Sequence, residues 1–312
     1  MPKSKFKIGK GIWKFNTSLL KNSSFCREIE TQWYNLMEIP GEKNWEWWEK
    51  IKQIFKEISI KHSKTSEKNY RQKLKEIDEG IKQLDALLLY CNDNELKNKI
   101  LEEKNELTEQ IDVLSKEHYQ GCLIRSKCEI LVNNENPSSN FLRLESNYAK
   151  SHIIKGVLDE KKQLTKDSYE TLNACEKFYK ELYKFEEIDE NTEREFTECL
   201  PQVPRILANN CEEYLNFEEI KKALMSMLNG KSPGSDGLPA EFYKHFWYLI
   251  GETITIIINN TLHYESELSP SQRLGIIRIF SKNDKEKTDL KNYRPISLLN
   301  TDYKIIAKTI AN

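Results

Sequence analysis

The stretch Gly275-Ile-Ile-Arg-Ile-Phe-Ser-Lys282, followed after a polar connection by Asn292-Tyr-Arg-Pro-Ile-Ser-Leu-Leu-Asn300, decides how this 312-residue chain is interpreted. Both runs contain short apolar segments rich in β-branched residues, and residues 283–289 between them are charged and turn-forming. This pattern predicts an antiparallel β-hairpin. Thr301 or Asp302 is then placed to cap a following helix.

The charge of this C-terminal part differs from that of the whole chain. Residues 273–312 carry nine basic and four acidic side chains, a local charge of +5, whereas the whole chain has a net charge of −1. Such a surplus suits phosphate groups. The alternative is a solvated hairpin whose lysines protect its edges against aggregation.

The two runs resemble the first two motifs of reverse transcriptases of non-LTR retrotransposons, of the long interspersed element type. The resemblance implies a fingers hairpin that binds the incoming nucleoside triphosphate through Lys282, at the end of the first strand, and Arg294, at the start of the second. The side-chain chemistry agrees, because Arg offers phosphate oxygens a planar fork and Lys a compact charge.

A glycine-rich loop precedes this region and imitates a phosphate cradle. Gly230-Lys-Ser232 matches the end of a P-loop, but Met225 stands where that motif needs its first glycine. A helix rather than a strand is expected over residues 217–228. The sequence therefore argues against a P-loop nucleoside triphosphatase.

The same loop resembles the segment just before the first polymerase motif of non-LTR reverse transcriptases, and the resemblance implies that it guides the template. Lys231 and the backbone amides at Gly234 and Gly237 are the candidate phosphate contacts. Asp236 is expected to hydrogen-bond the backbone of the turn rather than to bind a metal.

The N-terminal half is expected to be helical. Trp45, Trp47 and Trp48 lie beside basic residues such as Lys52, and their helical spacing favours core contacts, with base stacking as the alternative. Apolar residues over 66–118 recur at heptad spacing on both sides of a turn at Asn92-Asp-Asn94, with Glu103 at one seam position. This spacing predicts an antiparallel helical hairpin.

The remaining segments carry weaker signals. Residues 1–24 resemble the tail of the family's endonuclease domain and are expected to be poorly ordered. Residues 119–150 resemble the linker before the polymerase, where Arg125 and Lys127 are candidate template contacts or else ordinary surface cations. Residues 155–220 carry nine basic and seventeen acidic side chains, so they repel nucleic acid and are interpreted as scaffold.

The fold class expected is mainly α with a small antiparallel β-hairpin, combining a long helical hairpin with part of a right-hand polymerase's fingers. The expected domains are an endonuclease tail, a helical linker with the coiled-coil hairpin, a second linker with an acidic second half, and an incomplete set of fingers. Their bounds are 1–24, 25–118, 119–215 and 216–312.

The function expected is that of a truncated RNA-directed DNA polymerase whose partners are an RNA template and a DNA primer. The metal-binding aspartates of the resembling family are expected beyond Asn312, and the sequence contains no Asp-Asp doublet. No catalytic or metal-ligating residue is therefore assigned, Mg²⁺ is expected only for the full-length polymerase, and the chain alone is expected to be inactive.

A different function class stays open. Residues 66–118 can instead serve a helical interaction module that pairs with itself or with another protein. Seven unpatterned cysteines and a basic start without an apolar signal region favour a cytoplasmic and nuclear location. No apolar run is long enough to span a membrane.

Overall fold

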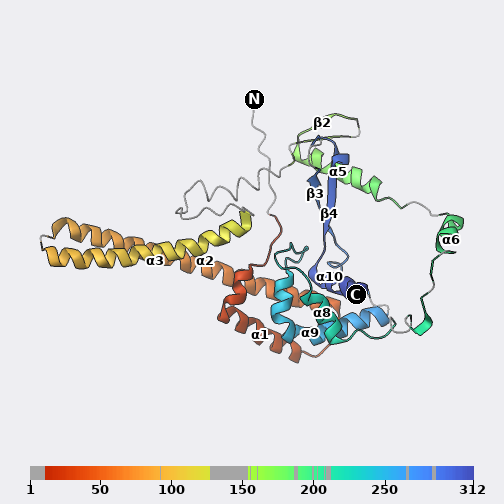
Figure 1. Ribbon diagram of the computed structural model, residues 1–312, viewed down its shortest axis with the longest axis horizontal. Coiled ribbons are helices and arrows are strands. Elements are labelled where there is room, and N and C mark those ends of the chain that lie inside the picture. Colours follow the sequence, from red (N-terminus) through yellow and green to blue (C-terminus); the bar gives the residue numbers. More distant parts are fainter. Residues whose placement is uncertain are drawn as a thin grey trace. The chain divides into compact units, whose positions relative to one another are not determined.

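The computed structural model describes residues 11–91, 93–126, 154, 156–159, 161–185, 189–198, 200–201, 203–206, 208, 212–264, 267–282 and 286–312, with the side chains of α3 described as far as Lys116. The chain forms two compact units, one of residues 1–60 with 156–312 and one of residues 61–155. The described parts are mainly helical with two small antiparallel β-hairpins (Figure 1). This confirms the prediction of a mainly α fold with a small antiparallel hairpin and adds a second hairpin. No described helix is long and apolar enough to cross a membrane.

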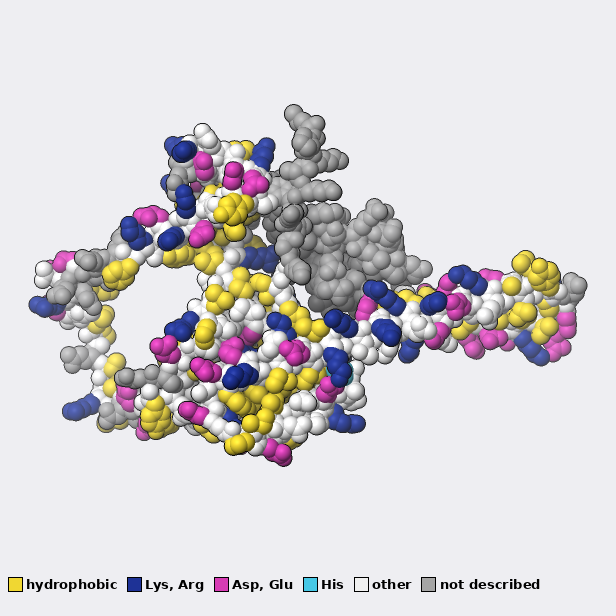
Figure 2. Space-filling view, turned by 180° about the vertical axis from the view of Figure 1, so that it is seen from behind, with side chains coloured by type: hydrophobic (Ala, Val, Ile, Leu, Met, Phe, Trp, Pro, Cys, Tyr) yellow, Lys and Arg dark blue, Asp and Glu magenta, His cyan; other side chains and the backbone are white. Residues whose placement is uncertain are grey.

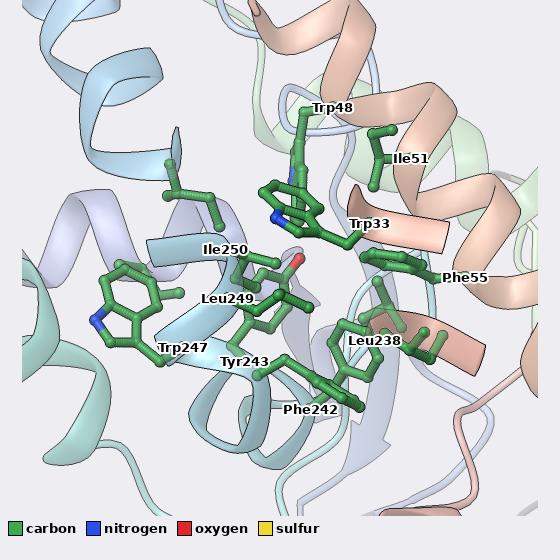
Figure 3. Packing of buried hydrophobic residues seen from close by; sticks show 14 of the residues in the cluster. Trp33, Trp48, Ile51, Phe55, Leu238, Phe242, Tyr243, Trp247, Leu249 and Ile250 are labelled. Atoms are coloured by element: carbon green, nitrogen blue, oxygen red, sulfur yellow. The ribbon is translucent and has the colours of Figure 1, made fainter. Parts of the chain in front are cut away.

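The main core of the first unit forms where three helices meet. These are α1 (Ser23–Glu38), the start of α2 (Trp45–Tyr90) and α9 (Ala240–His263). Figure 3 shows their large side chains packed together, with Trp48 of α2 facing Tyr243 of α9 at 6.3 Å between ring centroids. Trp45 and Trp48 are buried, so the prediction of core contacts is confirmed for both.

The described part of the N-terminal segment packs against this core instead of fraying. Phe15 is buried against Phe25 and Phe242, and its backbone N–H donates to the carbonyl of Gly237 at 3.0 Å. Leu19, in the short 3₁₀ helix η1 (Thr17–Lys21), is also buried. The expectation of poor order over 1–24 therefore fails for residues 11–24, because their partner is a loop more than two hundred residues away.

Two shorter helices, α8 (Phe217–Met225) and α10 (Thr301–Ala311), pack against each other beside α9. Helix α8 begins with a complete capping box between Asn216 and Glu219. Helix α10 has Asn300 at its N-cap position, without a side-chain cap. Neither Thr301 nor Asp302 is the N-cap residue, so that prediction is wrong as to position. Thr301 donates to the carbonyl of Leu238, whereas Asp302 accepts the first-turn N–H of Tyr303 at 2.8 Å as well as bonds from α2.

The second unit is an antiparallel helical hairpin, as predicted. The end of α2 runs against α3 (Asn94–Ser126), and Lys104 of α3 forms an ion pair with Asp85 of α2 at 2.5 Å. A Cβ on Gly80 would contact Leu107 at 3.2 Å, so the two helices approach closely there.

Two details of that hairpin differ from the expectation. The charged seam position belongs to Lys104 and not to Glu103, which is exposed. Leu96, the first apolar residue of the predicted heptad pattern after the turn, is 50% exposed and therefore lies outside the seam. Near the turn, Leu89 and Tyr90 are also exposed, and Figure 2 shows the apolar side chains at this end of the hairpin.

Among its described residues, the acidic segment (155–220) contains a small hairpin and the helices α5 and α6. Strands β1 (Val157–Leu158) and β2 (Leu164–Thr165) are antiparallel, and α5 (Ser168–Leu182) follows with Asp167 capping its first amides. Helix α6 spans Glu190–Glu198. The second hairpin consists of β3 (Ile276–Ser281) and β4 (Tyr293–Leu298).

Candidate functional site

The pairing of β3 with β4 brings the two predicted nucleotide-binding cations together. Phe280 pairs with Arg294, and the N–H of Lys282 donates to the carbonyl of Asn292 at 2.7 Å, which continues the ladder by one residue pair. Because side chains alternate between the faces of a strand, Lys282 lies on the same face as Phe280. Lys282 and Arg294 are therefore diagonal neighbours, a geometry that places Cβ atoms at most about 7–8 Å apart.

A third cation shares this face. Arg278 lies two residues before Phe280, and its guanidinium is 5.0 Å from the centre of the Phe280 ring. Arg278 was not among the residues predicted to bind the nucleotide. The alternation of residues 278, 280 and 282 was the signal that could have placed it beside Lys282.

Among the described residues, no acid neutralises these cations. No carboxylate among the described residues pairs with Arg278, Lys282 or Arg294. The Lys282 ammonium donates instead to the backbone carbonyl of Lys291 at 2.8 Å, and Arg294 is exposed. We call these three residues the cationic face of the hairpin.

The opposite face of the hairpin is held by the acidic segment. The N–H of Leu158 in β1 donates to the carbonyl of Thr288 at 2.8 Å, and Figure 1 shows α5 near the same end of the hairpin. Tyr293 is buried, and its hydroxyl donates to the carbonyl of Lys287 at 2.6 Å. Burial raises the pKa of this hydroxyl, and the nearby Cys175 of α5 raises it further. The acidic segment therefore supports the hairpin from the side away from the cationic face.

The glycine-rich loop is packed where it meets the base of the hairpin. A Cβ at Gly234 would collide with the backbone and side chain of Asn300, and one at Gly237 would collide with Trp13. Gly237 has φ of 78°, and its N–H donates to the Gly234 carbonyl at 3.3 Å. Both glycines are buried, so the structure gives them a packing role, and their contact with a template stays a prediction.

The other predicted template residues are placed differently. Lys231 is exposed beside the loop, where a phosphate can reach it. Lys127 lies outside the described residues, and Arg125 lies at the end of α3, where side chains are not described. Their template contact also stays a prediction.

A buried cluster of charges that the sequence did not predict lies between α2, the glycine-rich loop and the start of α10. Lys52 of α2 is 3% exposed, and its ammonium lies 2.7 Å from Glu49, 2.8 Å from Asp302 and 3.4 Å from Asp236. Lys52 therefore does not stack on a base beside the tryptophans. We call these four residues the buried charge cluster.

Hydrogen bonds from neighbouring elements complete the buried charge cluster. The indole N–H of Trp48 donates to Asp302 at 3.2 Å, and the hydroxyls of Ser269 and Ser271 donate to Glu49. Asp236 accepts the N–H of Leu238 at 3.0 Å, which confirms its predicted bond to the turn backbone. The cluster thus joins α2, the glycine-rich loop and the start of α10.

The protonation of the cluster follows from this geometry. Burial lowers the pKa of Lys52, but Asp302, Asp236 and Glu49 more than offset it, so the pKa lies above its ordinary value. Burial, and next Asp302, raises the pKa of Asp236 to about 6. Burial alone would raise the pKa of Glu49, but the nearby Lys52 ammonium has the larger effect together with the hydrogen bonds, so the pKa of Glu49 is lowered. The cluster therefore holds a charged ammonium and, near neutral pH, one carboxyl close to titration.

No arrangement among the described residues brings together three His, Cys, Asp or Glu side chains suited to a metal ion. The three carboxylates of the buried charge cluster surround the Lys52 ammonium instead. The chemistry that the cationic face offers is the binding of phosphate oxygens.

No protein-family model matches the chain. Over 301 residues, 96% of its length, it is 26% identical to the "Transposon TX1 uncharacterized 149 kDa protein" of Xenopus laevis. The matched region is 23% of that relative, so the chain spans about a quarter of its length. The chain is thus similar to a transposon protein along nearly all of its length.

Proposed function

We propose that the chain forms part of the RNA-directed DNA polymerase of a non-LTR retrotransposon and contributes the fingers elements that hold the incoming nucleoside triphosphate. The observation that carries the proposal is the register of β3 and β4, which sets Lys282 and Arg294 diagonally on one face. The similarity to a transposon protein supports the proposed origin.

The chemistry of the cationic face fits a triphosphate. Arg294 offers a planar fork for two phosphate oxygens, and Lys282 offers a point charge on a flexible stem. The bond from Lys282 to the Lys291 carbonyl is a single contact in a partly exposed setting, so a phosphate can replace it at little cost. Arg278 adds a third positive charge to the same face.

The partners follow from the same assignment. The RNA template would pass along the glycine-rich loop near Lys231, with Gly234 and Gly237 shaping the turn, and a DNA primer would meet the triphosphate. Arg125 and Lys127 stay candidate template contacts from the linker. Since the acidic segment lies behind the hairpin, it keeps negative charge away from the cationic face.

Catalysis needs more than these elements. Mg²⁺ is the cofactor that we expect for the full-length polymerase, but the described residues contain no cluster that could hold it. We therefore derive no metal-dependent step and propose that this chain alone extends no primer. Template-dependent incorporation of deoxynucleotides by the purified chain with Mg²⁺ or Mn²⁺ would contradict this part of the proposal.

Salt-dependent binding of a deoxynucleoside triphosphate tests the proposed role. The Lys282→Ala/Arg294→Ala variant should weaken binding of the triphosphate and reduce the slope of log K against log salt, because both lost side chains are charge partners of its phosphates. A matched control is Lys287→Ala, an exposed lysine in the hairpin turn. Equal slopes for the wild type and the double variant would contradict the proposal.

A second function rests on the helical hairpin. Its exposed apolar tip, at Leu87, Leu89 and Tyr90, favours an interaction module. However, the ion pair between Asp85 and Lys104 shows that the seam closes within one chain. Sedimentation distinguishes the two, because a monomer at micromolar concentration favours the polymerase proposal and a dimer broken by Leu89→Asp favours the module.

A further inference from the structure

A cavity of about 500 Å³ opens between the end of α8, the glycine-rich loop and α10. Its size lies within the range of about 300–1,000 Å³ typical of ligand pockets. Five apolar residues line it: Met227, Leu228, Ala240, Leu299 and Ala307.

Three lysines also line this cavity: Lys231, Lys304 and Lys308. None of them forms an ion pair with a carboxylate among the described residues. Lys304 and Lys308 make only long bonds, to the backbone carbonyls of Ser232 at 3.5 Å and Ser226 at 3.4 Å. Uncompensated ammonium groups beside an apolar surface suit a ligand that is anionic at one end and flat or apolar at the other.

Tyr303 supplies an aromatic side chain at the same place. It is partly buried in the cavity wall, and its hydroxyl has no hydrogen-bond partner among the described residues. Aromatic side chains beside cations are the usual means by which proteins hold unpaired bases. Burial lowers the pKa of Lys304, against an opposing effect of Asp236, which agrees with a cation held close to the apolar wall.

We propose that this cavity binds one unpaired nucleotide of a single-stranded RNA, with the base against Tyr303 and Ala307 and the phosphate beside Lys304. A duplex would not fit this role, because its bases stay stacked on one another. The site deepens the proposed function, on which it rests, since Lys231 belongs both to the cavity and to the glycine-rich loop that would guide the template.

A cavity-filling variant tests the proposal in the full 312-residue chain. Ala307→Trp adds an indole to the cavity without changing charge, and Ile310→Trp adds one to an exposed position of α10 outside it. We expect Ala307→Trp to weaken binding of a fluorescent 12-nucleotide RNA about fivefold or more, the lower bound for losing one stacked base, and Ile310→Trp to leave binding unchanged.

A charge variant provides the second arm and keeps the test valid if the indole disturbs folding. Lys304→Gln with Lys308→Gln should reduce the salt slope by roughly 1. The exposed pair Lys50→Gln with Lys287→Gln, outside the cavity, should leave the slope unchanged. Thermal melting of each variant checks that the fold persists.

The outcomes separate this site from the proposed function. If Ala307→Trp folds and binds RNA as well as the wild type does, the proposal that the cavity binds a nucleotide is overturned, whereas the proposed role of the hairpin is not. If inorganic polyphosphate or an acidic peptide competes as strongly as RNA does, the proposal that the cavity binds a base is overturned. A chain that binds no RNA overturns both proposals.

Discussion

Two groups of cations in one compact unit have opposite surroundings. Lys52 is buried and lies within 3.4 Å of three carboxylates, whereas Lys282 and Arg294 lie on a β-hairpin with no carboxylate paired to either among the described residues. The charge of Lys52 is paired with carboxylates inside the protein. Lys282 and Arg294 have no such partner among the described residues, and the phosphates of a nucleotide can supply one.

The comparison teaches that the partners of a basic residue, rather than its local sequence, decide its role. Lys52 lies among tryptophans for which base stacking was the alternative to core contacts, and it links three elements of the fold. Lys282 and Arg294 lie on a short β-hairpin and are absent from the buried hydrophobic core. If this distinction is correct, removing the first group damages stability and removing the second damages only binding.

The largest expected effect follows from breaking the buried charge cluster. Lys52→Met leaves the buried carboxylates of Asp236 and Asp302, and the partly buried Glu49, without their cation. Removing one partner of a buried ion pair typically costs about 3–5 kcal/mol. Urea denaturation of the full chain measures the loss. Lys50→Met, at an exposed position two residues earlier on α2, should change the free energy of unfolding by less than about 0.5 kcal/mol. Equal effects of the two variants would show that Lys52 is not a structural cation.

A smaller effect tests the loop that carries Asp236. Gly237 and Gly230 both have positive φ, 78° and 73°, but an added Cβ would collide with another segment only at Gly237, where it meets Trp13. Alanine at either position costs about 1–2 kcal/mol for the left-handed backbone, and at Gly237 the collision adds to this. We expect Gly237→Ala to lower the melting temperature clearly more than Gly230→Ala does. The reverse order would contradict the packing assigned to Gly237.

The pH dependence of the free energy of unfolding should reveal the raised pKa of Asp236. Its pKa in the folded protein, about 6, exceeds the unfolded value of about 3.9, so the folded state binds more protons between these values. Stability contributed by this group is therefore present below about pH 4 and lost as pH rises through 6. From pH 7 to 4.5 we expect the wild type to gain on the order of 1–2 kcal/mol relative to Asp236→Asn. Parallel pH profiles of the two proteins in urea denaturation would refute the raised pKa.

The smallest effect on stability should come from the cationic face. Arg294 is exposed, so Arg294→Ala should change the free energy of unfolding by less than about 0.5 kcal/mol. The measurement is the same urea denaturation as for Lys52→Met. A loss above about 2 kcal/mol would place Arg294 among the structural cations and remove the contrast between the two groups.

The local features of the fold were predictable from the sequence. Two β-branched runs around a turn predicted the β3–β4 hairpin, and heptad spacing predicted the pairing of α2 with α3. The error at Glu103 arose because the turn at residues 92–94 resets the heptad, so the seam phase after it is not fixed by the first helix. Lys104 then takes the seam position and pairs with Asp85.

The distant contacts were not predictable in this way. Lys52 is separated from Asp236 by 184 residues and from Asp302 by 250, so no local pattern links them. Phe15 likewise depends on the carbonyl of Gly237. For the candidate site, the alternation of side chains along paired strands was enough to place Lys282 and Arg294 on one face. The contacts of β1 and α5 with the hairpin could be seen only in the tertiary structure.

A double-mutant cycle on triphosphate binding tests the central claim most directly. Titration of a fluorescent deoxynucleoside triphosphate into the wild type, Lys282→Ala, Arg294→Ala and the double variant measures how the two side chains interact. If both contact the same triphosphate, each single variant weakens binding and their effects are non-additive by at least about 0.5 kcal/mol. Additive effects, or equal affinity in all four proteins, would contradict the account.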